Sequence, residues 1–253
     1  QDITLTGNSA NRAGIALANI SLNATNGSIS ATGSSTNGNG VEFFGNNTLT
    51  AQQISVNGTS AYQNFDREEG GTNEPYGGRG VSIDGSITFT GDTTITGKGG
   101  SGAGVGITGI SSLNFINSNA EINASNTGVK EDNYTGALAF IQFSDAMTDS
   151  TLNFGLQNSN LSINANSTYG AGMSGWNSAI NKEDDNYNTT VSLSGTGNVI
   201  INATSQENHG FKNISINASG LNGTAALNGT STNGSGVNLN DSHMTNVTVS
   251  GSS

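Results

Sequence analysis

The chain has 253 residues, of which 32% are apolar and 10% are charged, with 37 glycines, one proline and no cysteine. Globular domains usually contain about 45–50% apolar residues, so this sequence lacks the Leu, Ile and Phe that a thick single core would need. The formal net charge is −11, with only seven Lys and Arg. Nucleic acids and anionic lipid headgroups are therefore excluded as expected partners, because binding them requires basic side chains.

A short repeat runs through the chain: Gly or Ala, then an apolar residue, any residue, and usually a second apolar residue. The nonapeptide "STNGNGVEF" at 35–43, for example, returns as "STNGSGVNL" at 231–239. The shortest intervals between successive copies are 24 and 26 residues, and the longer ones contain insertions. The first residues of the eight copies, which we call anchors, are Gly14, Gly40, Gly80, Gly104, Ala137, Gly172, Gly210 and Gly236.

Two further short segments with alternating apolar and polar residues follow most anchors. After Gly14 they are "NISLNA" and "GSISATG", and after Gly80 they are "SITFTG" and "TTITGKG". Strict alternation predicts strands with one buried face, and the Asn, Gly, Ser and Thr between them predict turns. Three strands per unit of about 24 residues are typical of a solenoid. The sequence therefore predicts an all-β fold, a right-handed parallel β-helix of about eight coils with three short strands each and loop insertions.

The repeat covers the whole chain, so we expect residues 1–253 to form a single β-helix segment. The chain starts in the strand-like "DITLTG", and we expect it to be excised from a longer filament. An antiparallel sandwich or barrel is the alternative fold, although such folds usually carry hairpin dipeptides and longer strands. No apolar run approaches the length of a membrane span, so we expect no membrane insertion by this segment. The lack of Cys fits a protein that is exported unfolded or works outside the cell without disulfides.

Three insertions interrupt the repeat, at 61–78, 128–134 and 176–188. They hold nine of the eighteen acidic residues, four of the five tyrosines, the only Trp and the only Pro. The first two insertions follow the third strand of their coils, so we expect them to leave the same edge of the rod about two coils apart. The third follows the first strand of its coil, which predicts a different edge.

Loops that project from a stiff scaffold are where recognition concentrates, and aromatic side chains offer rigid contact area. The alternative interpretation is that these are tolerated surface loops whose acidic residues keep the solenoid soluble. We favour a binding role, and the receptor-binding candidates are Tyr62, Phe65, Asp66, Arg67, Glu68, Glu69, Tyr76, Tyr134, Trp176 and Tyr187.

The units "LNATNGSISATGSSTNGNGVEF" and "LNGTAALNGTSTNGSGVNL" resemble the haemagglutinin-type repeats of two-partner-secreted exoproteins. That family includes filamentous haemagglutinin-like adhesins and the CdiA effectors of contact-dependent growth inhibition in Gram-negative bacteria. The resemblance implies a β-helical filament at the cell surface or secreted. It is greatest to the central section of CdiA, which recognises an outer-membrane protein on a target cell upstream of toxin delivery. The irregular intervals and the insertions depart from a plain shaft.

The resemblance leads us to expect a non-enzymatic recognition segment whose partner is an outer-membrane protein on a neighbouring bacterium, with a surface glycan as an additional candidate. A host-directed adhesin segment of the same secretion class and a structural shaft are the alternatives. A carbohydrate-active β-helix enzyme is a further alternative, because Asp84 and Asp92 lie on neighbouring segments of one coil. Such an enzyme also needs basic residues in its cleft, and this stretch has only Arg79 and Lys98.

Other chemical motifs are weak, and we expect no catalytic residues, cofactor or metal. The pattern G-x-G-x-x-G at Gly104, Gly106 and Gly109 precedes a predicted strand, whereas a dinucleotide fingerprint must open a helix. His209 and His243 have no Cys and no second His nearby in the sequence, so a zinc site lacks ligands.

Overall fold

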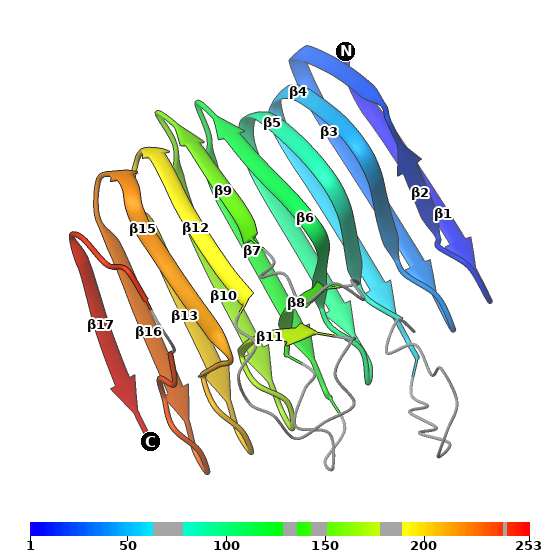
Figure 1. Ribbon diagram of the computed structural model, residues 1–253. Coiled ribbons are helices and arrows are strands. Elements are labelled where there is room, and N and C mark those ends of the chain that lie inside the picture. The colour runs from blue at the N-terminus through cyan, green and yellow to red at the C-terminus, as the bar shows by residue number, and fades with distance from the viewer. Residues whose placement is uncertain (63–77, 129–135, 143–150, 178–188, 240–241) are drawn as a thin grey trace.

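The computed structural model describes residues 1–62, 78–128, 136–142, 151–177, 189–239 and 242–253. The described strands form one parallel sheet that winds around a narrow core, with the two chain ends at opposite ends of the rod (Figure 1). This confirms the parallel β-helix. Because the pairings are parallel and join one coil to the next, the antiparallel sandwich or barrel is wrong.

Each coil begins at an anchor and presents three faces, which we call face A, face B and face C in chain order. Face A starts at the anchor. The residue after each anchor donates its backbone N–H to the carbonyl of the next anchor, at 2.9–3.2 Å, from Ile15 to Phe211. All eight anchors are therefore stacked as predicted. The strands of face A are β2 (Ile15–Ala18), the start of β4 (Val41–Ser60), of β5 (Val81–Gly99) and of β6 (Val105–Ile116), β8 (Leu138–Gln142), β11 (Met173–Asn177) and β14 (Phe211–Lys212).

Face B follows face A and carries the largest core side chains. Its strands are the start of β3 (Ser21–Ser35), the middle of β4 and β5, the end of β6, then β9 (Thr151–Gln157), β12 (Thr189–Thr196) and β15 (Ile214–Asn222).

Face C closes each coil and keeps one register along the whole rod. Its strands are β1 (Ile3–Ser9), the ends of β3, β4 and β5, then β7 (Asn119–Asn126), β10 (Asn160–Ser167), β13 (Val199–Ser205), β16 (Ala225–Ser231) and β17 (Val247–Ser252).

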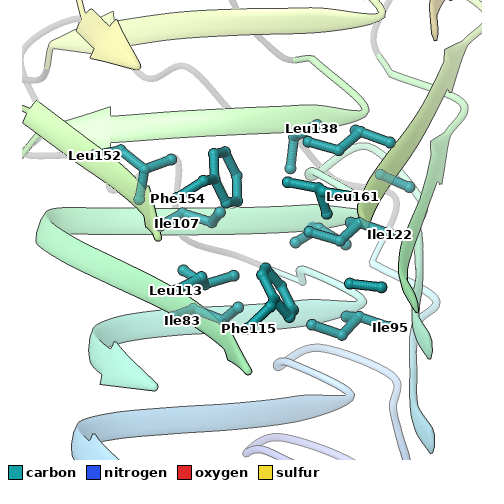
Figure 2. Close-up of a cluster of buried hydrophobic side chains, with 14 of the residues drawn as sticks. Ile83, Ile95, Ile107, Leu113, Phe115, Ile122, Leu138, Leu152, Phe154 and Leu161 are labelled. Carbon is teal, nitrogen blue, oxygen red and sulfur yellow. The ribbon is translucent and has the colours of Figure 1, made fainter. Parts of the chain in front are cut away.

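The core consists of files of inward side chains that stack from coil to coil. Figure 2 shows inward side chains from successive coils: Phe115 lies between Ile83 and Ile95, which belong to the preceding coil, and Phe154 comes from the coil after that of Phe115. Phe89 and Phe115 stack with ring centroids 5.5 Å apart. Each coil adds only a few apolar side chains, so 32% apolar residues are enough for a thin core of this kind.

Three strands are longer than the sequence predicts, because they continue around corners of the coil. β3, β4 and β5 run for 15, 20 and 19 residues, whereas short separate strands were predicted. The backbone of β4 and β5 turns at Gly45, Gly85 and Gly91, whose φ angles of 64°, 123° and 111° lie in the left-handed region that glycine adopts freely. The pairing of β4 and β5 continues through the corner at Gly45 and Gly85, and it shifts register at the corner near Gly91.

Serine closes the corner between face C and the next anchor. The Oγ of Ser35 accepts the N–H of Gly38 at 2.8 Å and donates to the carbonyl of Arg12 in the preceding coil at 2.7 Å. Ser231 makes the same two contacts, with Gly234 and with Asn208. The nearly identical nonapeptides therefore begin with the same corner, in which one hydroxyl ties two coils together.

Asparagines stack on the outside of face C. The side-chain amide of Asn164 donates to Asn123 at 3.0 Å, that of Asn202 to Asn164 at 2.9 Å, and that of Asn228 to Asn202 at 2.9 Å. The hydroxyl of Ser250 then donates to Asn228 at 2.6 Å. These amides satisfy one another along the rod, so the many asparagines of the repeat have a structural use.

We expect Ile122→Ala to lower the free energy of unfolding by about 2–5 kcal/mol, because it opens a cavity in a well-packed file. Ile122 is fully buried on face C between Ile95 and Ile163. Urea denaturation followed by circular dichroism measures the loss. Ser162→Ala, on the outer side of face C, is the control and should change stability by less than about 0.5 kcal/mol. Equal effects of the two substitutions would contradict the core described here.

Candidate functional site

The first insertion leaves and rejoins the rod at two touching residues. Its described ends are Tyr62 and Gly78, and a Cβ placed on Gly78 would lie 2.2 Å from the Cβ of Tyr62. Tyr62 is also tied to the next coil, because its carbonyl accepts the backbone N–H of Ser101 at 2.8 Å and the Ser101 hydroxyl at 3.1 Å. The base of this insertion is thus held in place by the corner between faces C and A.

The second insertion follows β7, at the same edge of the rod two coils later. The backbone N–H groups of Thr127 and Gly128 both donate to the carbonyl of Gly100, in the coil that Tyr62 contacts from the other side. This confirms the predicted common edge. Residues 129–134 of the predicted insertion lie outside the described residues.

Two further interruptions leave the opposite edge of face A. Residues 178–188 follow β11, which confirms the different edge predicted for the third insertion. Residues 143–150 follow β8 at the equivalent place in the preceding coil, and β8 pairs with β11. This second interruption is not among the three insertions predicted from the sequence. The interval of 35 residues between Ala137 and Gly172 could have shown it, since uninterrupted coils need 24–26.

All four interruptions therefore border the same face. Two begin at the corner before face A and two at the corner after it, within coils that lie next to or close to one another. Together residues 63–77, 129–135, 143–150 and 178–188 carry eleven of the eighteen acidic residues but three of the seven basic ones. They account for −8 of the net charge of −11.

The outer side of face A is closed to solvent between these edges. Ser82, Gly106, Ala139 and Ser174 follow one another in register and point away from the core, yet each is buried, with Ser174 only 1% exposed. Equivalent outward positions on face C, such as Thr94, are partly exposed. In the coils that contain Ser82, Gly106, Ala139 and Ser174, the outer side of face A is therefore not exposed for contact with a partner.

An open part of face A lies in the first three coils, which we call the Phe44 patch. It consists of Ala16, Ala18, Glu42, Phe44 and Asp84. Phe44 is 39% exposed, one of few large apolar side chains in the described part that are so open. Asp84 lies directly beside it in the register, and the two alanines cover the strand before it. The sequence analysis did not select Phe44, because its contact with Asp84 spans 40 residues of chain.

Charges at the edge of the Phe44 patch are partly buried. Burial raises the pKa of the Glu42 carboxyl, and a hydrogen bond from the Asn39 side chain and the charge of Arg79 oppose this shift only in part. The guanidinium of Arg79 is itself buried, at 4% exposure, and its Nη1 donates to Ser82 Oγ at 3.0 Å. The patch therefore combines the exposed ring of Phe44 with the carboxyl group of Glu42, whose burial is only partly offset by the Asn39 hydrogen bond and the charge of Arg79.

Most of the predicted receptor-binding residues lie outside the described residues. Tyr62 is described and partly exposed, and Trp176 lies on β11 in register with Ile141 of β8. The structure thus places the roots of the insertions, and two of the ten candidates, Tyr62 and Trp176, lie among the described residues. Those outside the described part are Phe65, Asp66, Arg67, Glu68, Glu69, Tyr76, Tyr134 and Tyr187.

The carboxylates considered for catalysis are on different parts of the coil. Asp84 lies on face A, whereas Asp92 lies at the corner between faces B and C, where it accepts hydrogen bonds from the backbone N–H and side-chain amide of Asn119 at 2.8 and 3.2 Å. Glu42, rather than Asp92, is the carboxylate that shares a face with Asp84.

The other motifs have structural roles. The Nδ1 atom of His209 accepts the backbone N–H of Ser235 at 3.0 Å, and burial lowers the pKa of His209. Of the G-x-G-x-x-G glycines, Gly104 directly precedes strand β6, and Gly106 and Gly109 lie within it. Within the described residues, no three His, Asp or Glu side chains are grouped so that they could hold a metal ion. The described residues also contain no helix that could cross a membrane.

Comparison of the chain with protein-family models, curated proteins and solved structures finds no match. The resemblance to haemagglutinin-type exoproteins therefore stays a prediction.

We expect Gly78→Ala to destabilise the protein by about 1–3 kcal/mol, because Gly78 has a φ of 75° and a new Cβ would collide with Tyr62. Chemical denaturation measures the loss. Gly155→Ala is the matched control: its Cβ would meet only the movable end of the Asn114 side chain, and the change should be small. A tolerated Gly78→Ala would contradict the closed base of the first insertion.

We expect Glu42→Gln to raise stability at neutral pH. The pKa of Glu42 is raised above its ordinary value of 4.5, so the folded state holds this proton more tightly than the unfolded state. Stability from this group is complete below pH 4.5 and is lost as the pH rises through the folded pKa. The stabilising effect of Gln should therefore disappear in acid. Urea midpoints of both proteins at about pH 4 and pH 7 test this, and equal differences at the two pH values would contradict it.

Proposed function

We propose that this chain is a non-enzymatic recognition segment of a filament at the surface of a Gram-negative bacterium. Its partner is an outer-membrane protein of a neighbouring bacterium, as in CdiA-like effectors upstream of toxin delivery. The observation that carries the proposal is the placement of all four interruptions along the two edges of face A. A plain spacer would have no reason to collect its irregular segments on one side.

The scaffold supports this role because its register holds the interruptions at fixed places. Segments that begin and end at touching or hydrogen-bonded residues lose less conformational freedom on binding than freely tethered loops. The first insertion meets this condition at Tyr62 and Gly78. It also carries Phe65 and Tyr76, and aromatic side chains are common anchors of protein interfaces.

The charge of the interruptions indicates the chemistry of the partner. A net charge of −8 beside one face favours a receptor surface that carries Lys and Arg, since complementary charges speed association and exclude acidic partners. The remaining described surface is dominated by Ser, Thr and Asn, so it offers little electrostatic attraction of its own.

Deletion of residues 63–77 should lower binding to target bacteria at least about tenfold, as expected when interface anchors are removed. The deletion joins Tyr62 to Gly78 and leaves "SAYGRG" between Ser60 and Gly80, the same pattern as the uninterrupted "STNGNG" corner. The shortened protein should therefore keep its fold, which circular dichroism and the unfolding midpoint would verify. Binding of labelled protein to target bacteria and to host cells is the measurement.

A second deletion and a surface substitution complete the design. Removal of 176–188 joins Gly175 to Thr189, two residues that lie in contact, and tests the opposite edge of face A. Ser30→Arg adds a bulky side chain to the outside of face C and should leave binding unchanged. Full binding by both deletions would contradict the proposal and favour the shaft, while loss of binding to host cells alone would favour the host-directed adhesin. Polysaccharide cleavage that Asp84→Asn abolishes would indicate the carbohydrate-active enzyme.

A further inference from the structure

The serine corner described above is interrupted where the second insertion begins. In an uninterrupted corner the serine accepts the N–H of the third residue after it and donates to a carbonyl of the preceding coil. Ser205 does so, with the N–H of Asn208 at 2.8 Å and the carbonyl of Gly170 at 2.7 Å. The equivalent acceptor carbonyl for Ser167 would belong to residue 129, which lies outside the described residues.

Two polar atoms at this corner are buried without a hydrogen-bond partner. They are the Oγ of Ser167 and the Oδ1 of Asn126, in residues that are 5% and 7% exposed. Asn126 and Ser167 are direct partners in the register of β7 and β10, so one strand spacing of about 4.8 Å separates their backbones. A buried polar atom without a partner costs about 1–3 kcal/mol, and this corner has two side by side.

The orientation of the Asn126 amide is determined by its other contacts. Its Nδ2 donates to the carbonyls of Gly102 and Gly136 at 3.2 and 3.4 Å. Rotating the amide by half a turn would place its oxygen against two carbonyl oxygens, which repel it. The unpartnered atom is therefore an acceptor, which needs a donor, whereas the neighbouring Ser167 hydroxyl can both donate and accept.

We propose that a single buried water molecule links Asn126 and Ser167. The water donates one hydrogen to Asn126 Oδ1 and accepts the hydroxyl hydrogen of Ser167, so both atoms are satisfied by one ligand. Buried waters with two to four polar partners are regular parts of protein interiors.

Both ligand atoms are neutral, and Gly100, whose carbonyl lies at the same corner, already accepts two backbone N–H groups. A water fits this set because it donates a hydrogen to Asn126 Oδ1 and accepts the hydroxyl hydrogen of Ser167. A cation could contact both oxygen atoms, but it cannot accept that hydrogen. A monovalent cation is the competing ligand, and the test separates the two.

Ser167→Ala tests the site, with Ser205→Ala as the matched control from an uninterrupted corner. If water links the two residues, both substitutions remove satisfied hydrogen bonds, and each should lower the unfolding midpoint by about 2–4 °C. An unchanged or raised midpoint for Ser167→Ala alone would overturn the proposal, because removal of an unsatisfied hydroxyl is neutral or stabilising.

Two measurements on the unaltered protein complete the test. A crystal structure should show one solvent peak within hydrogen-bond distance of Asn126 Oδ1 and Ser167 Oγ, and NMR should detect a long-lived water near the Asn126 side-chain amide protons. Lack of both signals would overturn the proposal. So would a midpoint that rises with NaCl or KCl but not with choline chloride at equal ionic strength, since that result identifies a cation.

Discussion

The hydrogen bond between successive anchors is the interaction on which the rest of the structure depends. The N–H after each anchor reaches the carbonyl of the next anchor, and this fixes every coil to one strand spacing from its neighbour. It also explains why small residues recur at the corner before the anchor. A Cβ on Gly33 would lie 2.1 Å from the carbonyl oxygen of Gly40, so a larger residue would force apart the corner that leads into the ladder.

The same ladder decides where the chain can vary. An extra residue within a strand would shift all later pairs and turn inward side chains outward. The long insertions are accordingly found at the two corners that flank face A. Small register shifts also occur at the corner between faces B and C, as between Ala24 and Ser28, and within face B, as between Ser192 and Ser194. Face C keeps its register from β1 to β17 and so keeps the coils aligned.

The regular coils carry mostly uncharged polar residues on their outer side, whereas the interruptions carry most of the acidic residues. Ser, Thr and Asn on the outside of the coils satisfy one another or the neighbouring backbone, as in the asparagine stack from Asn123 to Asn228. Acidic residues in such a stack would repel one another at one strand spacing. Most of the negative charge accordingly lies in the interruptions. The described coils carry fewer acidic residues, among them Glu42 and Asp84 in the Phe44 patch and Glu121, which accepts a hydrogen bond from Asn164 of the asparagine stack at 3.4 Å.

The sequence by itself determined the coil: the anchors, the inward files, the corners and the edges at which the three predicted insertions leave could be predicted because alternation and spacing act within one repeat. Tertiary structure alone decided that both edges border one face, that 143–150 belongs with 178–188, and that Phe44 lies beside Asp84. These relations join residues far apart in the chain, and each depends on the summed lengths of whole coils and on which way every corner turns. A local sequence pattern indicates neither the summed length of several coils nor the direction in which each corner turns. The placement of residues within a coil was therefore predictable, and the placement of one coil's irregular features beside another's was not.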